Sequence, residues 1–99
     1  MRYEWDVKKN FANHTKHGVV FEDVADFVWE SSLETFDVRK DYKELRMIAM
    51  STIRGRLHVL VYTRRSNSLR VISLRKANER EISNYEEVKA GIQANTPDA

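Results

Sequence analysis

The sequence predicts a small α+β domain in which helices cover an antiparallel sheet. Apolar residues recur at helical spacing near both ends of the 99-residue chain, whereas the middle holds three short segments rich in apolar residues. Tight turns separate these segments, at Arg54-Gly55 and at residues 65–68, and loops this short join antiparallel neighbours. We expect one domain over residues 1–94, with residues 95–99 as a short flexible tail.

The N-terminal third is expected to hold a short edge strand and two helices. Residues 3–5 are suited to the strand, and Asp6 then caps a helix over residues 7–17, because its carboxylate can accept hydrogen bonds from the first turn. Gly18 supplies the left-handed residue that ends this helix. A second helix is predicted over residues 21–28, where apolar residues recur at helical spacing.

A charged loop is predicted over residues 30–44, and three strands follow it. Their expected ranges are 45–52, 57–63 and 69–74. Both faces of the middle segment are largely apolar, which favours a central strand with helices on at least one face. Together with the short N-terminal strand, these segments predict an antiparallel sheet of three to four strands.

The last helix is predicted to begin at Asn78. Asn78 and Glu81 have the spacing of a capping box, in which each side chain bonds to the backbone N–H of the other residue. The expected buried stripe consists of Ile82, Tyr85, Val88 or Lys89, and Ile92.

Composition excludes several classes of protein. With 41% hydrophobic and 32% charged residues, the chain is typical of a globular domain. Cysteine is absent, which excludes disulfides, thiolate metal sites and a cysteine nucleophile. The N-terminus lacks the apolar core of a signal peptide, and no apolar run is long enough to span a membrane. We therefore expect a soluble cytoplasmic protein.

Basic residues concentrate where the last strand meets the last helix. Between Arg64 and Arg80 there are six basic residues and one acid, Glu79, giving a local charge of +5 on a chain of net charge +2. Basic groups beside a helix N-terminus form a site for an anion, above all a phosphate. RNA is therefore the leading candidate partner, although a run of arginines is also typical of an ordinary solvated surface.

The remaining motifs favour chemistry without a cofactor. His14 and His17 are three apart on one helix, but no third ligand follows at a suitable distance, and they fit a helix C-terminus equally well. The sequence contains no Gly-rich phosphate loop. One reaction suits such a chain, namely RNA cleavage in which the substrate's 2′-hydroxyl attacks the adjacent phosphate. Arginines would bind the phosphate, and His58, Glu81 or Tyr85 would transfer protons.

These residues, taken in order, resemble the BrnT toxins of bacterial type II toxin–antitoxin systems, within the wider RelE-like ribonuclease group. The similarity extends from about Tyr3 to Tyr85. It is carried by Glu4-Trp5-Asp6, Lys9, Asn13, Lys16-His17-Gly18-Val19, Phe21-Glu22, Arg46, Gly55-Arg56, Val61-Tyr62-Thr63, Arg65, Arg70-Val71-Ile72-Ser73, Arg75-Lys76-Ala77, Arg80-Glu81 and Tyr85.

The resemblance implies a RelE-like fold and a metal-independent, cofactor-free endoribonuclease that inhibits translation and growth. It also implies neutralisation by a BrnA-type antitoxin with a ribbon-helix-helix DNA-binding part. In the implied complex the toxin is dimeric, and the complex binds operator DNA through the antitoxin.

Carried over residue by residue, the resemblance assigns phosphate binding and transition-state stabilisation to arginines. From the resemblance the residues expected to be catalytic are Arg65, Arg75 and Arg80, with Lys43 as a proton carrier, and residue chemistry alone adds His58 as a further proton carrier. Arg46, Arg70 and Lys76 are expected to bind RNA, and Arg64 is added because it belongs to the basic cluster. Two positions depart from the family pattern: Arg64 stands where an acid is common, and Met50 where a glycine is usual.

Two alternatives remain at this point. A catalytically inactive relative would bind the antitoxin and act as a co-repressor, and the Arg64 departure allows this. A free-standing RNA-binding domain would need exposed aromatic residues on which bases stack. Trp5, Phe36 and Tyr62 look more like core or edge residues than such a platform.

Overall fold

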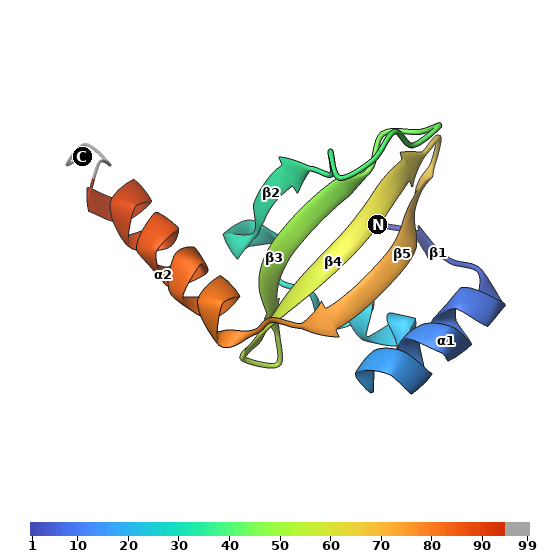
Figure 1. Cartoon of the computed structure of the whole chain (residues 1–99), viewed down its shortest axis with the longest axis horizontal. Coiled ribbons are helices and arrows are strands. Elements are labelled where there is room, and N and C mark those ends of the chain that lie inside the picture. The colour runs from blue at the N-terminus through green and yellow to red at the C-terminus, as the bar shows by residue number, and fades with distance from the viewer. Residues whose placement is uncertain (95–99) are drawn as a thin grey trace.

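The computed structural model describes residues 1–94 and contains one five-stranded sheet with the strand order β1-β5-β4-β3-β2. Figure 1 shows helix α1 beside the β5 edge and helix α2 extending away from the opposite, β2 side. The elements are β1 (Tyr3–Glu4), α1 (Val7–His17), the 3₁₀ helices η1 (Phe21–Asp26) and η2 (Trp29–Ser31), β2 (Leu33–Phe36), β3 (Met47–Ile53), β4 (Arg56–Arg65), β5 (Ser68–Lys76) and α2 (Glu79–Ala94).

The first helix has the ends that the sequence predicts. Asp6 Oδ1 accepts hydrogen bonds from the backbone N–H groups of Lys8, at 2.8 Å, and Lys9, at 3.1 Å. Gly18 has φ +72° and donates its N–H to the carbonyl of His14 at 2.8 Å. A residue with a side chain would be strained in this left-handed conformation. The expected helix over residues 7–17 is therefore confirmed.

Asn13 fixes α1 against the sheet. Its Nδ2 donates to the carbonyls of Val19, at 2.8 Å, and Leu74, at 2.7 Å, and its Oδ1 accepts from the Leu74 N–H at 3.2 Å. Asn13 is itself buried, so these bonds satisfy a side chain that would otherwise destabilise the fold. They hold α1 along β5.

The predicted second helix is wrong in type and extent. Residues 21–28 do not form one α-helix, because the 3₁₀ helix η1 ends at Asp26 and η2 follows separately. Beyond η1 the chain is extended, with Phe27 in an isolated β-bridge to Ile53 and the Val28 N–H donating to the Thr52 carbonyl at 3.0 Å. These contacts with β3 require extended backbone and therefore stop the helix early.

The sheet contains more strands than the three to four predicted. The three central strands pair antiparallel as expected, and Arg54 at φ +48° and Gly55 at φ +79° form the tight turn between β3 and β4. However, β2 lies within the stretch 30–44 that the sequence predicts as loop, and it pairs antiparallel with β3. The expected edge strand near Tyr3 is present as β1 and runs parallel to β5.

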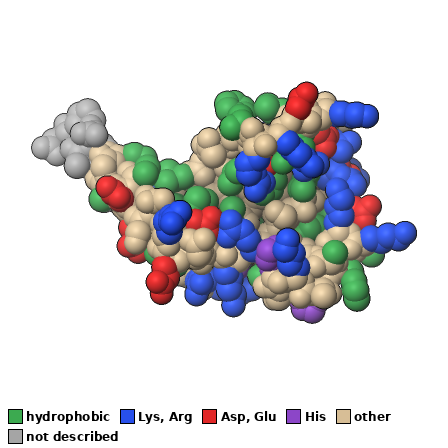
Figure 2. All heavy atoms as spheres, in the orientation of Figure 1, with side chains coloured by type: hydrophobic (Ala, Val, Ile, Leu, Met, Phe, Trp, Pro, Cys, Tyr) green, Lys and Arg blue, Asp and Glu red, His purple; other side chains and the backbone are tan. Residues whose placement is uncertain are grey.

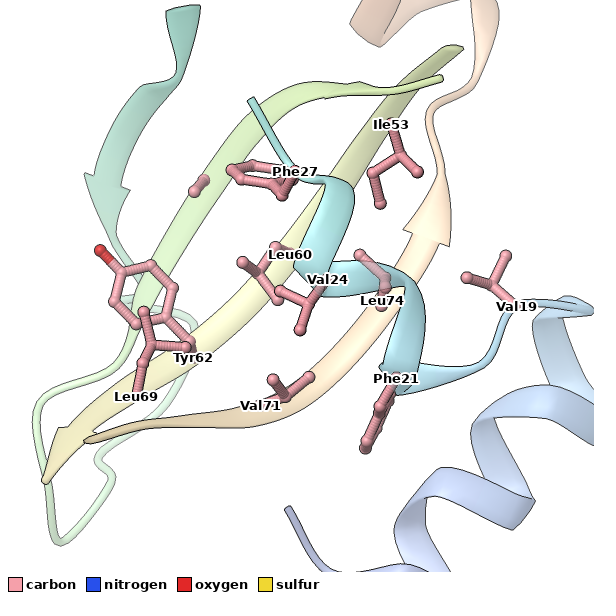
Figure 3. Packing of buried hydrophobic residues seen from close by; sticks show 11 residues of the cluster. Val19, Phe21, Val24, Phe27, Ile53, Leu60, Tyr62, Leu69, Val71 and Leu74 are labelled. Carbon is pink, nitrogen blue, oxygen red and sulfur yellow. The ribbon is translucent and has the colours of Figure 1, made fainter. Parts of the chain in front are cut away.

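One face of the sheet carries the main core. Figure 3 shows buried side chains from η1, β4 and β5 meeting between η1 and the sheet. Phe21 is fully buried there, and Leu60 and Leu74 come to it from the two central strands. Burying such side chains contributes roughly 1.5–3 kcal/mol each relative to exposure. Among the described residues, the opposite sheet face carries no helix except at its α2 end (Figure 1).

Helix α2 begins with the predicted capping box. The Asn78 N–H donates to Glu81 Oε1 and the Glu81 N–H donates to Asn78 Oδ1, both at 2.9 Å. Ile82 and Tyr85 then pack against a small cluster around Val59 on the sheet face opposite η1. The Tyr85 hydroxyl donates to the Ser31 carbonyl at 2.6 Å, which ties the helix to η2.

The buried stripe predicted for α2 holds as far as Lys89 but not at Ile92. Of the alternatives Val88 and Lys89, Lys89 is half-buried and donates to the Ser31 carbonyl at 3.4 Å, whereas Val88 and Ile92 are 48% and 51% exposed. The helix leaves the sheet after Tyr85 and continues away from the body of the protein (Figure 1). The predicted tail over residues 95–99 lies outside the described residues. No helix among the described residues is long and apolar enough to cross a membrane.

Candidate functional site

The sheet face opposite η1 carries an extended row of arginines, which we call the basic stripe and define as Arg39, Arg65, Arg70 and Arg75. Figure 2 is viewed from this side and shows Lys and Arg side chains gathered over β4, β5 and the start of α2. Because this face has a helix only at its α2 end, the stripe lies on the broad open side of the sheet.

A β-bulge places Arg70 and Arg75 on the same face. Regular alternation would point two side chains five residues apart to opposite faces. The register shifts between Val61 and Tyr62, so that Arg70 lies opposite Thr63 and Arg75 lies opposite Val59. Directly paired residues share a face. The extra residue in β5 therefore brings both arginines to the open side.

The stripe is elongated rather than concentrated in one pocket. Arg65 ends β4, Arg70 lies opposite a residue two positions earlier in β4, and Arg75 lies opposite one four positions earlier still. At about 3.4 Å per residue, these offsets are roughly 7 Å and 14 Å. Side chains at such spacing suit a ligand with repeated negative charges along its length.

Arg39 joins the stripe through a loop that a buried carboxylate fixes. Asp37 has a fully buried side chain, and its two oxygens accept hydrogen bonds from Arg39 Nε and Nη2, both at 2.8 Å. These bonds hold the pKa of Asp37 well below its usual range. Arg39 is 67% exposed, and its charge acts on Arg75 across the open face. Sequence reasoning missed Arg39, although the Asp37-x-Arg39 spacing suits a local bidentate pair.

Arg75 is held by the first turn of α2. Its Nη1 and Nη2 donate to Glu81 Oε1 and Oε2, both at 2.8 Å. Glu81 is also the capping-box acid that accepts from the Asn78 N–H. The pair raises the pKa of Arg75 and lowers that of Glu81. One carboxylate therefore both caps α2 and fixes the direction of a stripe arginine.

The other stripe arginines are held less tightly. Arg65 Nη2 lies 3.2 Å from Glu44 Oε2, and the two side chains are 47% and 37% exposed. Arg70 is half-buried, and its charge helps to lower the pKa of Asp6 at the start of α1, after the larger effect of the Lys9 N–H. Arg65 and Arg70 are thus available to an added anion at small cost.

The remaining predicted basic residues divide between the two ends of the sheet. Lys76 and Arg80 are exposed at the β5–α2 junction, but Lys76 pairs with His58 and therefore points to the η1 side of the sheet, opposite Arg75. Lys43 and Arg46 lie in the loop before β3, where an open cavity of about 540 Å³ is found, and the Arg46 guanidinium lies 4.1 Å from the centre of the Tyr42 ring. Arg64 is two residues after Tyr62 in β4, so its side chain points to the same face of the sheet as that core residue, the η1 side.

His58 lies away from the basic stripe. It is 4% exposed on the η1 side of β4, and its Nδ1 lies 2.7 Å from the Arg56 carbonyl oxygen. Burial lowers its pKa, and the charge of Lys76 acts in the same direction. The prediction that His58 carries a proton to or from a bound RNA therefore does not fit its position. Of the three proton-transfer candidates, only Glu81 contacts a stripe arginine.

No group of three His, Cys, Asp or Glu side chains that could hold a metal ion is found within residues 1–94. His17 is partly buried at the end of α1, where burial, followed by the charges of Lys16 and Arg75, lowers its pKa. His14 lies one turn earlier and is exposed.

Comparison with known families gives one match. The family described as "Ribonuclease toxin, BrnT, of type II toxin-antitoxin system" matches residues 5–81, which is more than half of the chain. The matched range ends at Glu81, in the first turn of α2, and thus includes every residue of the basic stripe. No curated protein matches the chain.

Proposed function

The chain belongs to the BrnT family of ribonuclease toxins of type II toxin–antitoxin systems, and on this premise we propose that the basic stripe is the surface on which it binds and cleaves RNA. The family implies an RNA substrate and an antitoxin partner. The observation that carries the proposal is the alignment of Arg65, Arg70 and Arg75 on one open face, which a bulge in β5 makes possible. Their spread along the sheet suits the repeated phosphates of a single strand.

Cleavage is proposed to need no metal. The 2′-hydroxyl oxygen of the substrate attacks the adjacent phosphorus, the bond to the 5′-oxygen breaks, and the products carry a 2′,3′-cyclic phosphate and a 5′-hydroxyl. The protein must position the phosphate and stabilise the charge that develops on its oxygens. A guanidinium suits both tasks because it donates two parallel hydrogen bonds to phosphate oxygens. Arg75 is the best placed, with Arg80 close to it in the chain, whereas Lys76 points to the opposite sheet face.

Glu81 is the proposed proton acceptor. It is the carboxylate in direct contact with Arg75, at 2.8 Å, and a general base must lie within hydrogen-bond reach of the hydroxyl that it deprotonates. Its lowered pKa keeps it ionised at neutral pH, which is the form required. Tyr85 is less suited because its hydroxyl already donates to the Ser31 carbonyl.

We propose that the antitoxin is of the BrnA type, with a ribbon-helix-helix part that binds operator DNA in a complex with dimeric toxin. An acidic segment of the antitoxin would cover the basic stripe and so exclude RNA. Binding of this kind weakens with added salt, because surface charges are screened. Salt-insensitive association would instead indicate a mainly apolar interface.

Induced expression in bacteria tests the proposal. Expressed in the cytoplasm, the wild type should arrest growth of the cells and fragment total RNA. The Arg75→Ala and Arg80→Ala variants should do neither while remaining folded. Arg54→Ala is a matched control, since Arg54 is an exposed arginine in the β3–β4 turn that pairs with Asp23 and Asp26. Growth arrest by both the Arg75→Ala and Arg80→Ala variants, with RNA cut as by the wild type, would refute the assignment of the site.

One observation favours the alternative that the chain is an inactive partner of the antitoxin. Glu81 already occupies two N–H groups of Arg75, so the contact has a structural use without RNA. Under this alternative the purified chain binds the antitoxin but leaves RNA intact at high protein concentration. RNA fragments from pure wild-type protein would exclude it.

A further inference from the structure

A pocket separate from the basic stripe lies at the far end of the sheet from Arg75. We call it the Tyr62 pocket; it has a volume of about 420 Å³, and its lining includes Glu34, Glu44, Leu45, Met47, Tyr62 and Arg64. This volume falls in the roughly 300–1,000 Å³ range of small-molecule sites. Figure 3 shows the Tyr62 hydroxyl pointing from β4 toward β2, where Glu34 lies.

Tyr62 holds the Glu34 carboxylate in a fixed position. The Tyr62 hydroxyl donates to Glu34 Oε1, and burial raises the pKa of Tyr62 to about 12, so the hydroxyl keeps its hydrogen at neutral pH. Glu34 is itself exposed, and a carboxylate oxygen can accept more than one hydrogen bond. The carboxylate is thus oriented by the protein and accessible to a ligand.

The charges of the pocket disfavour a phosphate and favour a group that both donates and accepts. Glu44 pairs with Arg65 at 3.2 Å, which leaves Glu34 and Arg64 as the opposite charges that line the pocket. The Arg64 guanidinium lies 5.9 Å from the centre of the Tyr62 ring. A flat ligand in the pocket would meet the Glu34 carboxylate as an acceptor, the Arg64 guanidinium as a planar cation, and apolar carbon from Leu45 and Met47.

We propose that the Tyr62 pocket binds a guanine base of the RNA and gives the protein a preference for guanine. Guanine offers two parallel N–H donors on its Watson–Crick edge, which match a carboxylate, and the acceptors O6 and N7, which match a guanidinium. No other RNA base offers both sets. The pocket lies on the η1 side of the sheet and the stripe on the other side, and the Glu44–Arg65 contact links them at the end of β4. An RNA strand that passes round this end of the sheet would bring the phosphate next to the bound base to Arg65. This inference rests on the proposed function, since it assumes an RNA ligand.

Titration of the purified full-length protein with 5′-GMP, 5′-AMP, 5′-CMP and 5′-UMP, followed by two-dimensional NMR, tests the pocket without any cleavage. The four nucleotides share their phosphate, so a difference among them reports the base. GMP should bind roughly tenfold or more tightly than the others, as expected for bidentate recognition. It should also shift the Trp29 indole signal, because the Trp29 ring lies 5.5 Å from that of Tyr62.

Glu34→Gln and Arg64→Met should each remove the preference for GMP. If one of these variants fails to fold, the other still tests the proposal. Glu87→Gln on α2 is the matched control and should keep the preference, since Glu87 is exposed and remote from the pocket lining. The proposal would be overturned if the four nucleotides bound equally or if none of them bound. It would also be overturned if arginine amide displaced GMP at a concentration below that of GMP. The last result would indicate a basic side chain of a protein partner.

Cleavage-site mapping separates this inference from the proposed function. If the wild type cuts RNA with no bias toward guanine and GMP shows no preference, the pocket proposal fails and the stripe proposal stands. If GMP binds preferentially but pure protein cuts no RNA, the pocket proposal stands and the proposed cleavage chemistry fails.

Discussion

The pair formed by Arg75 and Glu81 joins the proposed chemistry to the stability of the fold, so breaking it is the most informative perturbation. Arg75→Met removes the guanidinium and keeps most of the apolar stem, and Glu81→Gln removes the charge while retaining an oxygen for the Asn78 N–H. The two single variants and the double variant form a thermodynamic cycle, which isolates the pairwise contribution.

The magnitude follows from the geometry of the contact. Both hydrogen bonds are 2.8 Å long, and the side chains are 35% and 23% exposed. A fully exposed pair contributes about 0.2–1 kcal/mol. Breaking a buried pair costs roughly 3–5 kcal/mol. At this intermediate exposure, discounted for screening by solvent, we expect each single variant to lower the free energy of unfolding by about 1–2 kcal/mol, with a coupling of about 1 kcal/mol.

Urea unfolding followed by tryptophan fluorescence measures the cycle, and 1 kcal/mol corresponds to roughly 4–8 °C in Tm for a domain of this size. The pKa of Glu81 is lowered on folding, so the stabilisation is fully present above its unfolded pKa of about 4.3 and is lost as pH falls through the folded value. The coupling should therefore shrink in acid. A coupling of zero at neutral pH would refute the claim that this pair holds α2 and Arg75 together.

The same variants separate positioning from catalysis, because Glu81→Gln removes a negative charge beside Arg75. RNA binding by this variant should be equal to or tighter than that of the wild type, while its cleavage rate should fall by about 10²–10⁴, as for loss of a general base. Cleavage at the wild-type rate by a folded Glu81→Gln protein would exclude Glu81 as the base.

Four further predictions concern the core, the loop and the stripe. Phe21→Ala should lower the free energy of unfolding by about 3–5 kcal/mol in urea titrations, because the ring is fully buried. Asp37→Asn should cost about 1–2 kcal/mol at neutral pH by the same method. Since folding lowers the pKa of Asp37, the difference from wild type should begin to shrink as pH falls below about 3.9 and disappear only when the pH passes through the lower folded-state pKa. Arg70→Ala should leave stability unchanged and reduce the slope of log affinity for RNA against log salt by about 1, measured by fluorescence anisotropy. His58→Asn should lower Tm but cleave RNA at the wild-type rate in a gel assay, because His58 faces η1.

Local signals predicted both ends of α1 and the start of α2. Asp6 and Gly18 define the ends of α1, and the pair Asn78 and Glu81 defines the start of α2. Each of these residues makes its capping hydrogen bond to a group only a few positions away in the chain. The tight turn at Arg54-Gly55 was predictable for the same reason. Signals of this kind do not depend on the packing of distant elements.

Features set by distant contacts were not predictable. Three of the four residues of β2 are exposed, Glu34 among them, so its sequence has no buried alternation, and only pairing with β3 makes it a strand. The helix expected over residues 21–28 breaks at Phe27 because β3 binds the backbone there. The far half of α2 has apolar residues at helical spacing, yet the helix leaves the sheet before Val88 reaches it.

The candidate site was predicted as a set of residues but not as a surface. Charge density in the sequence identified Arg65, Arg70 and Arg75, and strict alternation would have placed Arg70 and Arg75 on opposite faces. The bulge that aligns them has no glycine or proline to mark it, since the shifted segment is Val71-Ile72-Ser73. Arg39 joins the stripe only through the folded loop.

The measurement that tests the central claim most directly is cleavage of a defined single-stranded RNA by the purified protein in the presence of EDTA, with analysis of the new ends. The wild type should produce 2′,3′-cyclic phosphate and 5′-hydroxyl ends, and the double variant Arg70→Ala and Arg75→Ala, folded by circular dichroism, should produce none. Equal cleavage by the double variant would contradict the assignment of the basic stripe, and cleavage by the wild type that EDTA abolishes would contradict the metal-independent mechanism.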